Sequence, residues 1–236
     1  MSTVKTINQV SPGVLQQLRA LDACTVSNAI ERLDIRLRNE GFADSSVRCL
    51  TPELAPMVGY AATGRIRTSV APTTRHWYVD RMEWWTSILD IPAPRVIVLQ
   101  DVDDRRGFGA LFGEIHTHIA LALGCAGYFT NGAVRDLPAI ARTNFHVFAS
   151  GVAVSHAYAH VVDFGEPVEI AGLSVRPGDL LHGDLHGVQC VPAEVAPQVP
   201  EVASKLLAQE REFLEFCHSP GFSVDKLRDF IERNWT

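Results

Sequence analysis

The sequence predicts one layered α/β domain. Strand-like runs alternate with helical patterns through the middle of the chain, and short strand-like runs cluster in the last third. The 236 residues contain no internal repeat, low-complexity tract or linker, so a single domain spanning residues 1–236 is the simplest organisation. Neither GxGxxG after a strand nor GxxxxGK(S/T) occurs, so nucleotide-binding folds have no motif to support them.

Composition and charge exclude several classes of protein. With 47% hydrophobic and 20% charged residues the chain has an ordinary globular composition and ample material for a core. A net charge of −6 argues against nucleic-acid binding, which usually needs a basic face. No apolar run approaches the length of a membrane span, and the N-terminus lacks the apolar core of a signal peptide. We therefore expect no membrane contact and a cytoplasmic location.

The cysteines point to neither a metal site nor a disulfide framework. Their number, 5, is odd, and no CxxC pair occurs. We expect buried free thiols, because the cysteines lie in apolar runs.

The first third of the chain predicts two helices and a strand. Residues 12–33 carry two helical patterns, and residues 25–28 offer caps for the second helix. A polar, irregular stretch over residues 39–56 precedes a strand at 59–69. Residues 74–90 look helical and hold three of the four tryptophans, for which packing is the simpler interpretation.

Residues 113–136, GEIHTHIALALGCAGYFTNGAVRD, are the stretch around which we expect the chain to be organised. A buried-strand pattern at 95–101 and a loop lead into it. It then predicts a helix, a short apolar strand and a tight turn that delivers Arg135 and Asp136 side by side. Arg is shaped to hold a carboxylate in a two-pronged grip, and Asp is a hard oxygen ligand for Mg²⁺ or Mn²⁺. A helix N-terminus offers free N–H groups to an anion. Together these devices predict a metal-assisted site for a small carboxylate such as a 2-oxo acid, although a surface ion pair is the simpler interpretation of an isolated Arg-Asp pair.

The last third of the chain predicts short strands followed by helices. A helical stub at 137–142 precedes a strand at 145–151, and residues 155–192 read as extended segments around two Gly-Asp turns. A long amphipathic helix is expected over 197–217 and a final helix over 225–235. We expect the N-terminal helices (about 12–33) and the C-terminal helices (about 197–235) to pack on the domain.

Other polar residues have structural interpretations. His116 and His118 are two apart, so they face different sides of a helix; we expect His116 beside the substrate and His118 packed or solvated. Four later histidines match no metal-ligand template: His156, His160, His182 and His186. Hydrogen bonds within turns account for Asp179 and Asp184. A solvated acidic loop is the simplest interpretation of three further residues: Asp101, Asp103 and Asp104.

Four segments together resemble one known family. They are DACTVSNAI (22–30), GYAATG (59–64), FGEIHTHIALALGCAGYFTNGAVRD (112–136) and VRPGDLLHGDLHGVQCVP (175–192). They are similar to the RraA-like family, which joins regulators of ribonuclease E activity with class II 4-hydroxy-4-methyl-2-oxoglutarate/4-carboxy-4-hydroxy-2-oxoadipate aldolases. The resemblance runs in order from about residue 12 to about residue 215.

The resemblance implies a β/β/α layered swivelling domain that forms homotrimers or hexamers with active sites at subunit interfaces. It implies that Arg135 grips the substrate carboxylate and that Asp136 holds a divalent metal, Mg²⁺ or Mn²⁺, largely through water. It also implies that Glu210 or Glu212 of a neighbouring subunit completes the site. The backbone that binds the oxo acid is implied to be the start of the central helix: Gly113, Glu114, Ile115 and His116.

Three positions depart from the family pattern. Asn28 and Asn131 stand where the family often has Asp, and His186 stands where a second acidic residue is common. These departures bear on the distal half of the substrate and leave the Arg135–Asp136 pair intact. Regulators within the family can lack the Asp after the Arg, so its presence here favours an enzyme.

The lysine inventory decides between two aldolase chemistries. Cleaving a 4-hydroxy-2-oxo acid leaves a pyruvate enolate, which either a lysine Schiff base or a metal stabilises. The chain has only Lys5, Lys205 and Lys226, all near its termini, so the metal route remains. We therefore predict a metal-dependent aldolase that releases pyruvate, with oxaloacetate decarboxylation as a side activity. The alternatives are a non-enzymatic protein that binds a ribonuclease, and a lyase or hydrolase acting on an unrelated 2-oxo or hydroxy acid.

Overall fold

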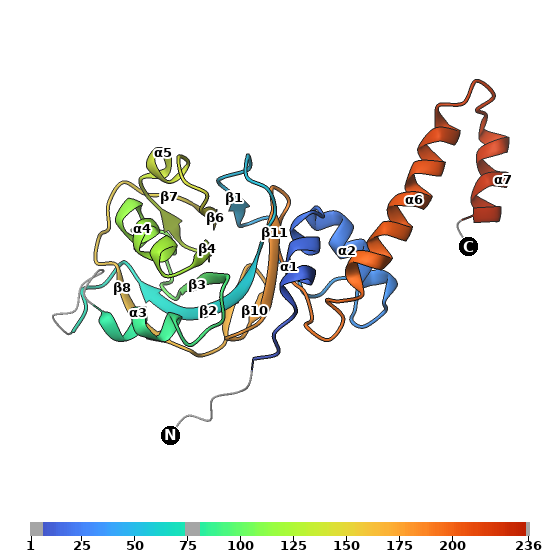
Figure 1. Ribbon diagram of the computed structural model, residues 1–236. Helices are drawn as coiled ribbons and strands as arrows, with labels where there is room; N and C mark the ends of the chain where they lie inside the picture. The colour runs from blue at the N-terminus through green and yellow to red at the C-terminus, as the bar shows by residue number, and fades with distance from the viewer. Residues whose placement is uncertain (1–6, 74–80, 235–236) are drawn as a thin grey trace.

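A mixed, eight-stranded sheet forms the centre of the molecule (Figure 1). The structure is a computed structural model that describes residues 7–73 and 81–234. The strands follow the order β1-β6-β4-β3-β2-β11-β12, β8 also pairs with β2, and the sheet is nearly closed. β2, β3, β4 and β6 are parallel, and β1, β8 and β11 run antiparallel to their neighbours. The bounds are β1 Arg48–Cys49, β2 Met57–Arg67, β3 Arg95–Asp101, β4 Cys125–Thr130, β6 His146–Ala149, β8 His160–Phe164, β11 Leu180–Asp184 and β12 Gly187–Cys190.

The central strands are apolar throughout because both faces of the sheet are covered. On β3, Ile97 and Leu99 face one hydrophobic cluster, whereas Val96 and Val98 face a second cluster on the opposite side. Such burial on both faces produces a continuous apolar run instead of an alternating one. The second cluster is covered by a small antiparallel pair, β9 (Val168–Ile170) and β10 (Leu173–Val175). The layered α/β class predicted from the sequence is confirmed.

The helices lie around this sheet in two groups. In Figure 1, α3, α4 and α5 lie around the left end of the sheet, and α1, α2 and the start of α6 lie at its right end; buried residues from all six helices join the main hydrophobic cluster. Within the described residues, no helix combines the length and apolarity needed to cross a membrane. The bounds are α1 Pro12–Arg19, α2 Ala23–Arg32, α3 Met82–Ile88, α4 Glu114–Ala122, α5 Leu137–Ile140, α6 Val199–Cys217 and α7 Val224–Asn234.

Side-chain caps set where the first two helices begin. The Val14 N–H donates to Ser11 Oγ at 3.3 Å, which caps α1. The Thr25 N–H donates to Asp22 Oδ1 at 2.8 Å, which caps α2. The sequence placed this second cap at residues 25–28; the helix begins earlier because Asp22 supplies the acceptor.

The tryptophan-rich segment contributes to the core. Trp84 and Trp85 on α3 are buried, and their ring centroids lie 4.3 Å apart. The predicted packing role is confirmed for Trp84, which belongs to the main hydrophobic cluster. Trp77 and the first part of the helix expected over 74–90 lie outside the described residues.

The C-terminal helices form a hairpin that projects away from the sheet (Figure 1). α6 buries Val199 and Ala203 near its start, where it lies beside α1 and α2. Farther along, its aromatic side chains face α7, and Phe216 stacks on Phe230 with centroids 4.6 Å apart. This arrangement differs from the expected packing of both helices on the domain, because the apolar face of α7 contacts α6 instead.

All five cysteines are free. Burial raises the pKa of both Cys125 and Cys190 to about 12. Cys24 on α2 is exposed, so the expectation of buried thiols is wrong for that residue.

Candidate active site

The turn that carries Arg135 and Asp136 is fixed from both sides. β5 (Ala133–Val134) pairs with β7 (Gly151–Val152), and the Arg135 N–H donates to the Phe112 carbonyl at 3.0 Å. Asp136 adopts a left-handed conformation with φ +56°, and its carbonyl accepts from the N–H groups of Ala139 and Ile140 in α5 at 2.9 and 3.1 Å. Asp is among the few non-glycine residues that tolerate this conformation, and such residues are concentrated at functional sites.

This turn delivers the Asp136 carboxylate to the start of α4. Its Oδ2 accepts from the Glu114 N–H at 3.2 Å, and its Oδ1 lies 3.2 Å from Arg135 Nε. Gly113 permits the approach, since a Cβ on that residue would lie 2.5 Å from Asp136 Oδ2. The guanidinium, the carboxylate and the helix N-terminus therefore meet at one point.

The meeting point is open to solvent. The side chains of Arg135 and Asp136 are 29% and 37% exposed, and Glu114 and Ile115 on the first turn of α4 are exposed as well. A small anion can therefore reach the N–H groups at the start of the helix.

His116 does not present its imidazole to this point. Its side chain is 1% exposed, and its ring centroid lies 5.4 Å from that of Phe112 and 5.6 Å from that of Trp85. The expectation of His116 beside the substrate is therefore wrong for the side chain; only its backbone lies in the first turn of α4. His118 is exposed.

The loop that leads from β3 to α4 is held by buried carboxylates. Asp101 is fully buried and accepts from the Asp103 N–H at 3.0 Å and the Gly107 N–H at 2.8 Å; burial raises its pKa. Asp103 accepts from the N–H groups of Thr68 and Ser69 at 2.6 and 2.8 Å. Burial opposes ionisation of Asp103, but these hydrogen bonds outweigh it and lower its pKa. The solvated-loop interpretation is wrong for both residues and holds for Asp104, which is exposed.

Asn131 also has a structural role. Its Oδ1 accepts from the Asp101 N–H at 2.7 Å, and its Nδ2 donates to the Asp101 carbonyl at 3.2 Å. It therefore ties the end of β3 to the end of β4. Nothing in the pattern NGAVRD distinguished such a tie from a turn, and only the neighbouring strand reveals it.

Asp184 and His186 lie at a different place, beside the start of α2. Asp184 Oδ2 accepts from the Ala23 N–H at 2.8 Å, and Oδ1 accepts from the His186 N–H at 2.8 Å. Asn28 lies on α2, which Figure 1 shows at the opposite end of the sheet from α5. The turn role predicted for Asp184 is confirmed, and it also caps α2.

Three histidines of the last third contact backbone carbonyls, whereas His186 Nδ1 lies 3.1 Å from the Asp184 carboxylate. His182 Nε2 lies 3.1 Å from the Leu18 carbonyl, and His156 Nδ1 lies 2.7 Å from the Ala110 carbonyl. Across residues 7–73 and 81–234, no three His, Cys, Asp or Glu side chains gather where they could hold a metal ion. The hydrogen bonds of His156 and His182 agree with the structural roles predicted for these two residues.

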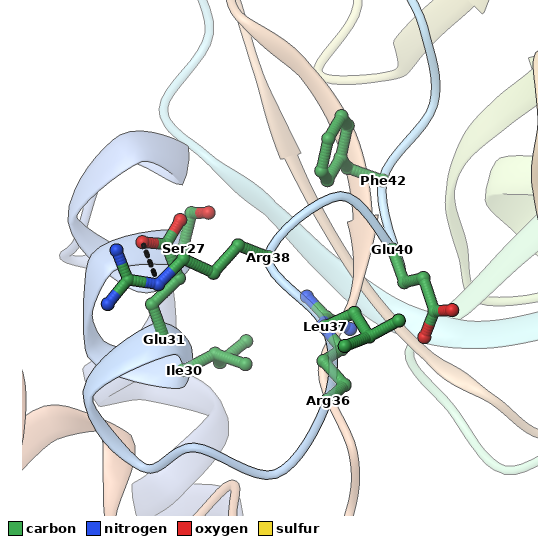
Figure 2. Close-up of a pocket in the computed structure, with 8 residues that line it drawn as sticks. All are labelled: Ser27, Ile30, Glu31, Arg36, Leu37, Arg38, Glu40 and Phe42. Carbon is green, nitrogen blue, oxygen red and sulfur yellow. Dashed lines mark ion pairs between the residues drawn. The ribbon is translucent and has the colours of Figure 1, made fainter.

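A shallow hollow beside α2 does not belong to the candidate site. Figure 2 shows the eight residues that line it, from α2 and the loop that follows. Glu31 and Arg38 pair across it at 3.9 Å, so their charges largely compensate each other. Figure 1 shows α2 at the opposite end of the sheet from α4 and α5.

A divalent cation fits Asp136 if water and substrate supply its remaining ligands. Within the part of the chain that the structure describes, each Asp136 carboxylate oxygen has a single hydrogen-bond or ion-pair contact, and the side chain is partly exposed. Mg²⁺ usually keeps several waters and binds through one or two carboxylates plus substrate oxygens. Asp136 therefore suits a cation held by one protein carboxylate, with water and substrate filling the other positions.

The comparison with known proteins identifies the family. The model of the RraA-like family, described as Aldolase/RraA, matches residues 23–189, a span that contains every residue of the candidate site. The chain belongs to the RraA-like family. The family resemblance inferred from the sequence is thereby confirmed.

Two curated relatives of this RraA-like chain match it over only part of their own length. Protein DlpA of Legionella pneumophila is 33% identical over 228 residues, which cover 92% of this chain and 34% of that protein. A protein of Halalkalibacterium halodurans named "Putative 4-hydroxy-4-methyl-2-oxoglutarate aldolase" is 31% identical over 102 residues, 43% of this chain and 49% of that protein. The chain thus spans about a third and about half of these relatives.

Solved structures share the fold of this RraA-like chain. An uncharacterized protein from Pseudomonas syringae pv. tomato superimposes with a TM-score of 0.72 at 25% identity, covering 97% of this chain and 98% of its own. Streptomyces coelicolor RraAS2, described as an unusual member of the RNase ES inhibitor RraA protein family, gives 0.65 at 19% identity, covering 88% and 97%. These similarities confirm the RraA-like fold.

Proposed function

We propose that this chain is a divalent-metal-dependent lyase that cleaves a 4-hydroxy-2-oxo acid and releases pyruvate. The observation that carries the proposal is the meeting of Arg135, Asp136 and the start of α4 at one solvent-exposed point. Each supplies something that a carboxylate substrate and its enolate need. Membership of a family whose description joins aldolases with RraA supports the same choice.

Arg135 and the helix start bind and orient the substrate. Arg135 contacts Asp136 through Nε, and within the described residues its Nη groups have no partner, so they remain for the substrate carboxylate. The first N–H groups of α4 lie at the same point and favour negative charge. Both devices stabilise the enolate more than the neutral oxo group, because negative charge develops as the C–C bond breaks.

Asp136 would hold the divalent cation, Mg²⁺ or Mn²⁺. Such a cation, when bound, supplies Lewis-acid polarisation of the 2-oxo group. Neither of the two lysines among the described residues lies at this point, because Lys205 is on α6, paired with Glu201 at 2.7 Å, and Lys226 is on α7. Oxaloacetate decarboxylation passes through the same enolate and is the proposed side activity.

We also propose that neighbouring subunits cover this site in a homotrimer or hexamer. Exposed apolar side chains surround the turn: Ile115 is 62% exposed, Val152 63% and Val154 95%. β7 pairs with β5, so Val152 lies beside Val134, next to Arg135. A subunit contact would remove these side chains from water. Glu210 or Glu212 on the projecting α6 is available to complete the site of a neighbour.

The test measures pyruvate release from 4-hydroxy-4-methyl-2-oxoglutarate, from oxaloacetate and from a panel of other 2-oxo acids. Each substrate is supplied with Mg²⁺, with Mn²⁺ and with a chelator. The proposal expects release that the chelator abolishes and added metal restores. A folded protein that releases pyruvate from none of them contradicts the lyase. Stable capture of a ribonuclease by such an inactive protein would then favour the regulator.

A further inference from the structure

We propose that Asp136 acts as an internal competitor for the substrate carboxylate, so that the substrate binds tightly only after a divalent cation has engaged Asp136. This inference rests on the proposed function, because it assigns the same donors to the substrate. It adds an order of binding: cation first, carboxylate second.

The competition follows from the contacts of the Asp136 carboxylate. Its Oδ2 accepts from the Glu114 N–H at 3.2 Å, and its Oδ1 lies 3.2 Å from Arg135 Nε. A helix-start N–H and a guanidinium are also the donors that a substrate carboxylate would use. Part of the anion site is therefore already filled by an anion that belongs to the chain.

The backbone keeps Asp136 beside these donors. Its left-handed conformation is held between the Phe112 carbonyl, which accepts from the Arg135 N–H, and the N–H groups of Ala139 and Ile140 in α5, which donate to its own carbonyl. Gly113 leaves just enough room, because any Cβ there would lie 2.5 Å from Asp136 Oδ2. The carboxylate can leave the donors only by rotation of its own side chain, and its exposed fraction of 37% lets a cation reach it.

Charge strengthens the effect. An incoming carboxylate meets the negative charge of Asp136 at close range, and the exposed Glu114 adds a second negative charge on the same helix turn. A divalent cation on Asp136 replaces this repulsion by attraction and draws the carboxylate away from Arg135 and the Glu114 N–H. Cation and substrate carboxylate should therefore each raise the affinity of the other.

Calorimetry with pyruvate as the probe tests this on the full chain, first in a chelator and then with saturating Mg²⁺. Wild type should bind pyruvate at least about tenfold more tightly with Mg²⁺. Asp136→Ala should bind pyruvate in the chelator at least about fivefold more tightly than wild type does there, and Mg²⁺ should no longer change its affinity. Glu114→Gln is the matched control, since it removes one negative charge nearby without freeing either donor.

Three results would contradict the proposal that Asp136 competes with the substrate carboxylate. Equal pyruvate affinity of wild type with and without Mg²⁺ overturns it, as does an Asp136→Ala affinity in chelator no higher than that of Glu114→Gln. Loss of pyruvate binding by Arg135→Ala in the chelator would support the proposed carboxylate site even if the competition is contradicted. Variants that unfold at the same temperature as wild type are correctly folded. If none of these proteins binds pyruvate, the proposed function is overturned, and the inference with it.

Discussion

Replacing Gly113 by alanine tests whether the site depends on one close approach. Gly113 has φ −150° and ψ −159°, an extended conformation that alanine adopts without strain. The added Cβ, however, would lie 2.5 Å from Asp136 Oδ2 and 2.9 Å from Arg135 Cγ. The whole effect of the substitution should therefore come from displacement of these two side chains.

The size of the effect follows from the overlap. Asp136 Oδ2 must retreat by about 0.9 Å to reach an ordinary contact of 3.4 Å. This breaks the hydrogen bond from the Glu114 N–H, which caps α4, and the loss of such a cap costs about 1 kcal/mol of unfolding free energy. A displacement of that size in a catalytic group lowers kcat/KM by about 100-fold.

Urea unfolding and pyruvate release measure the two effects. Gly151→Ala is the control, because nothing lies within 4 Å of its added Cβ, and it should match wild type in both assays. Combining Gly113→Ala with Asp136→Ala should reduce the stability cost of the first substitution, since its main steric partner is gone. A Gly113→Ala protein as stable and as active as Gly151→Ala would refute the reasoning.

Three further predictions concern residues outside the site. Burial lowers the pKa of His182, so this residue takes up a proton at a higher pH in the unfolded chain than in the folded protein. The stability that follows from this difference is fully present above about pH 6.5. It is lost as the pH falls further, by at most about 1.4 kcal/mol per pH unit. Urea unfolding from pH 8 to about pH 5 should show this slope in wild type and not in His182→Gln; equal slopes would contradict it. A thiol reagent should modify the exposed Cys24 in the folded protein. It should modify Cys125 only in denaturant, because burial covers this thiol and raises its pKa to about 12. Mass spectrometry that finds both cysteines modified at the same rate would contradict this prediction. Asp184→Ala should lower the unfolding free energy by about 1–2 kcal/mol because the Ala23 N–H loses its acceptor, and an unchanged urea midpoint would show that the cap is dispensable.

The sequence predicted those features that depend on neighbouring residues. The continuous apolar run of β3 and the helical period of α1 and α2 set their secondary structure locally. The candidate site was predictable for the same reason, since its parts lie within the 24 residues from 113 to 136. A single helix, strand and turn bring them together.

Features that depend on distant packing were not predictable. Polar residues such as Asp101 and Asp103 look solvated in sequence, and only a loop folded over the strand ends gives them buried N–H partners. His116 is buried because α3 places Trp85 beside it, and no spacing in the sequence encodes that contact. The amphipathic pattern of α7 likewise identifies its apolar face but not the helix that covers it.

The most direct test of the central claim compares wild type with Asp136→Ala in pyruvate release from 4-hydroxy-4-methyl-2-oxoglutarate, with Mg²⁺, with Mn²⁺ and with a chelator. We predict release by wild type that requires the metal, and a loss of at least about 100-fold in Asp136→Ala, because the carboxylate that holds the cation is gone. Wild-type release that persists in the chelator, or an Asp136→Ala protein as active as wild type with metal present, would contradict the account.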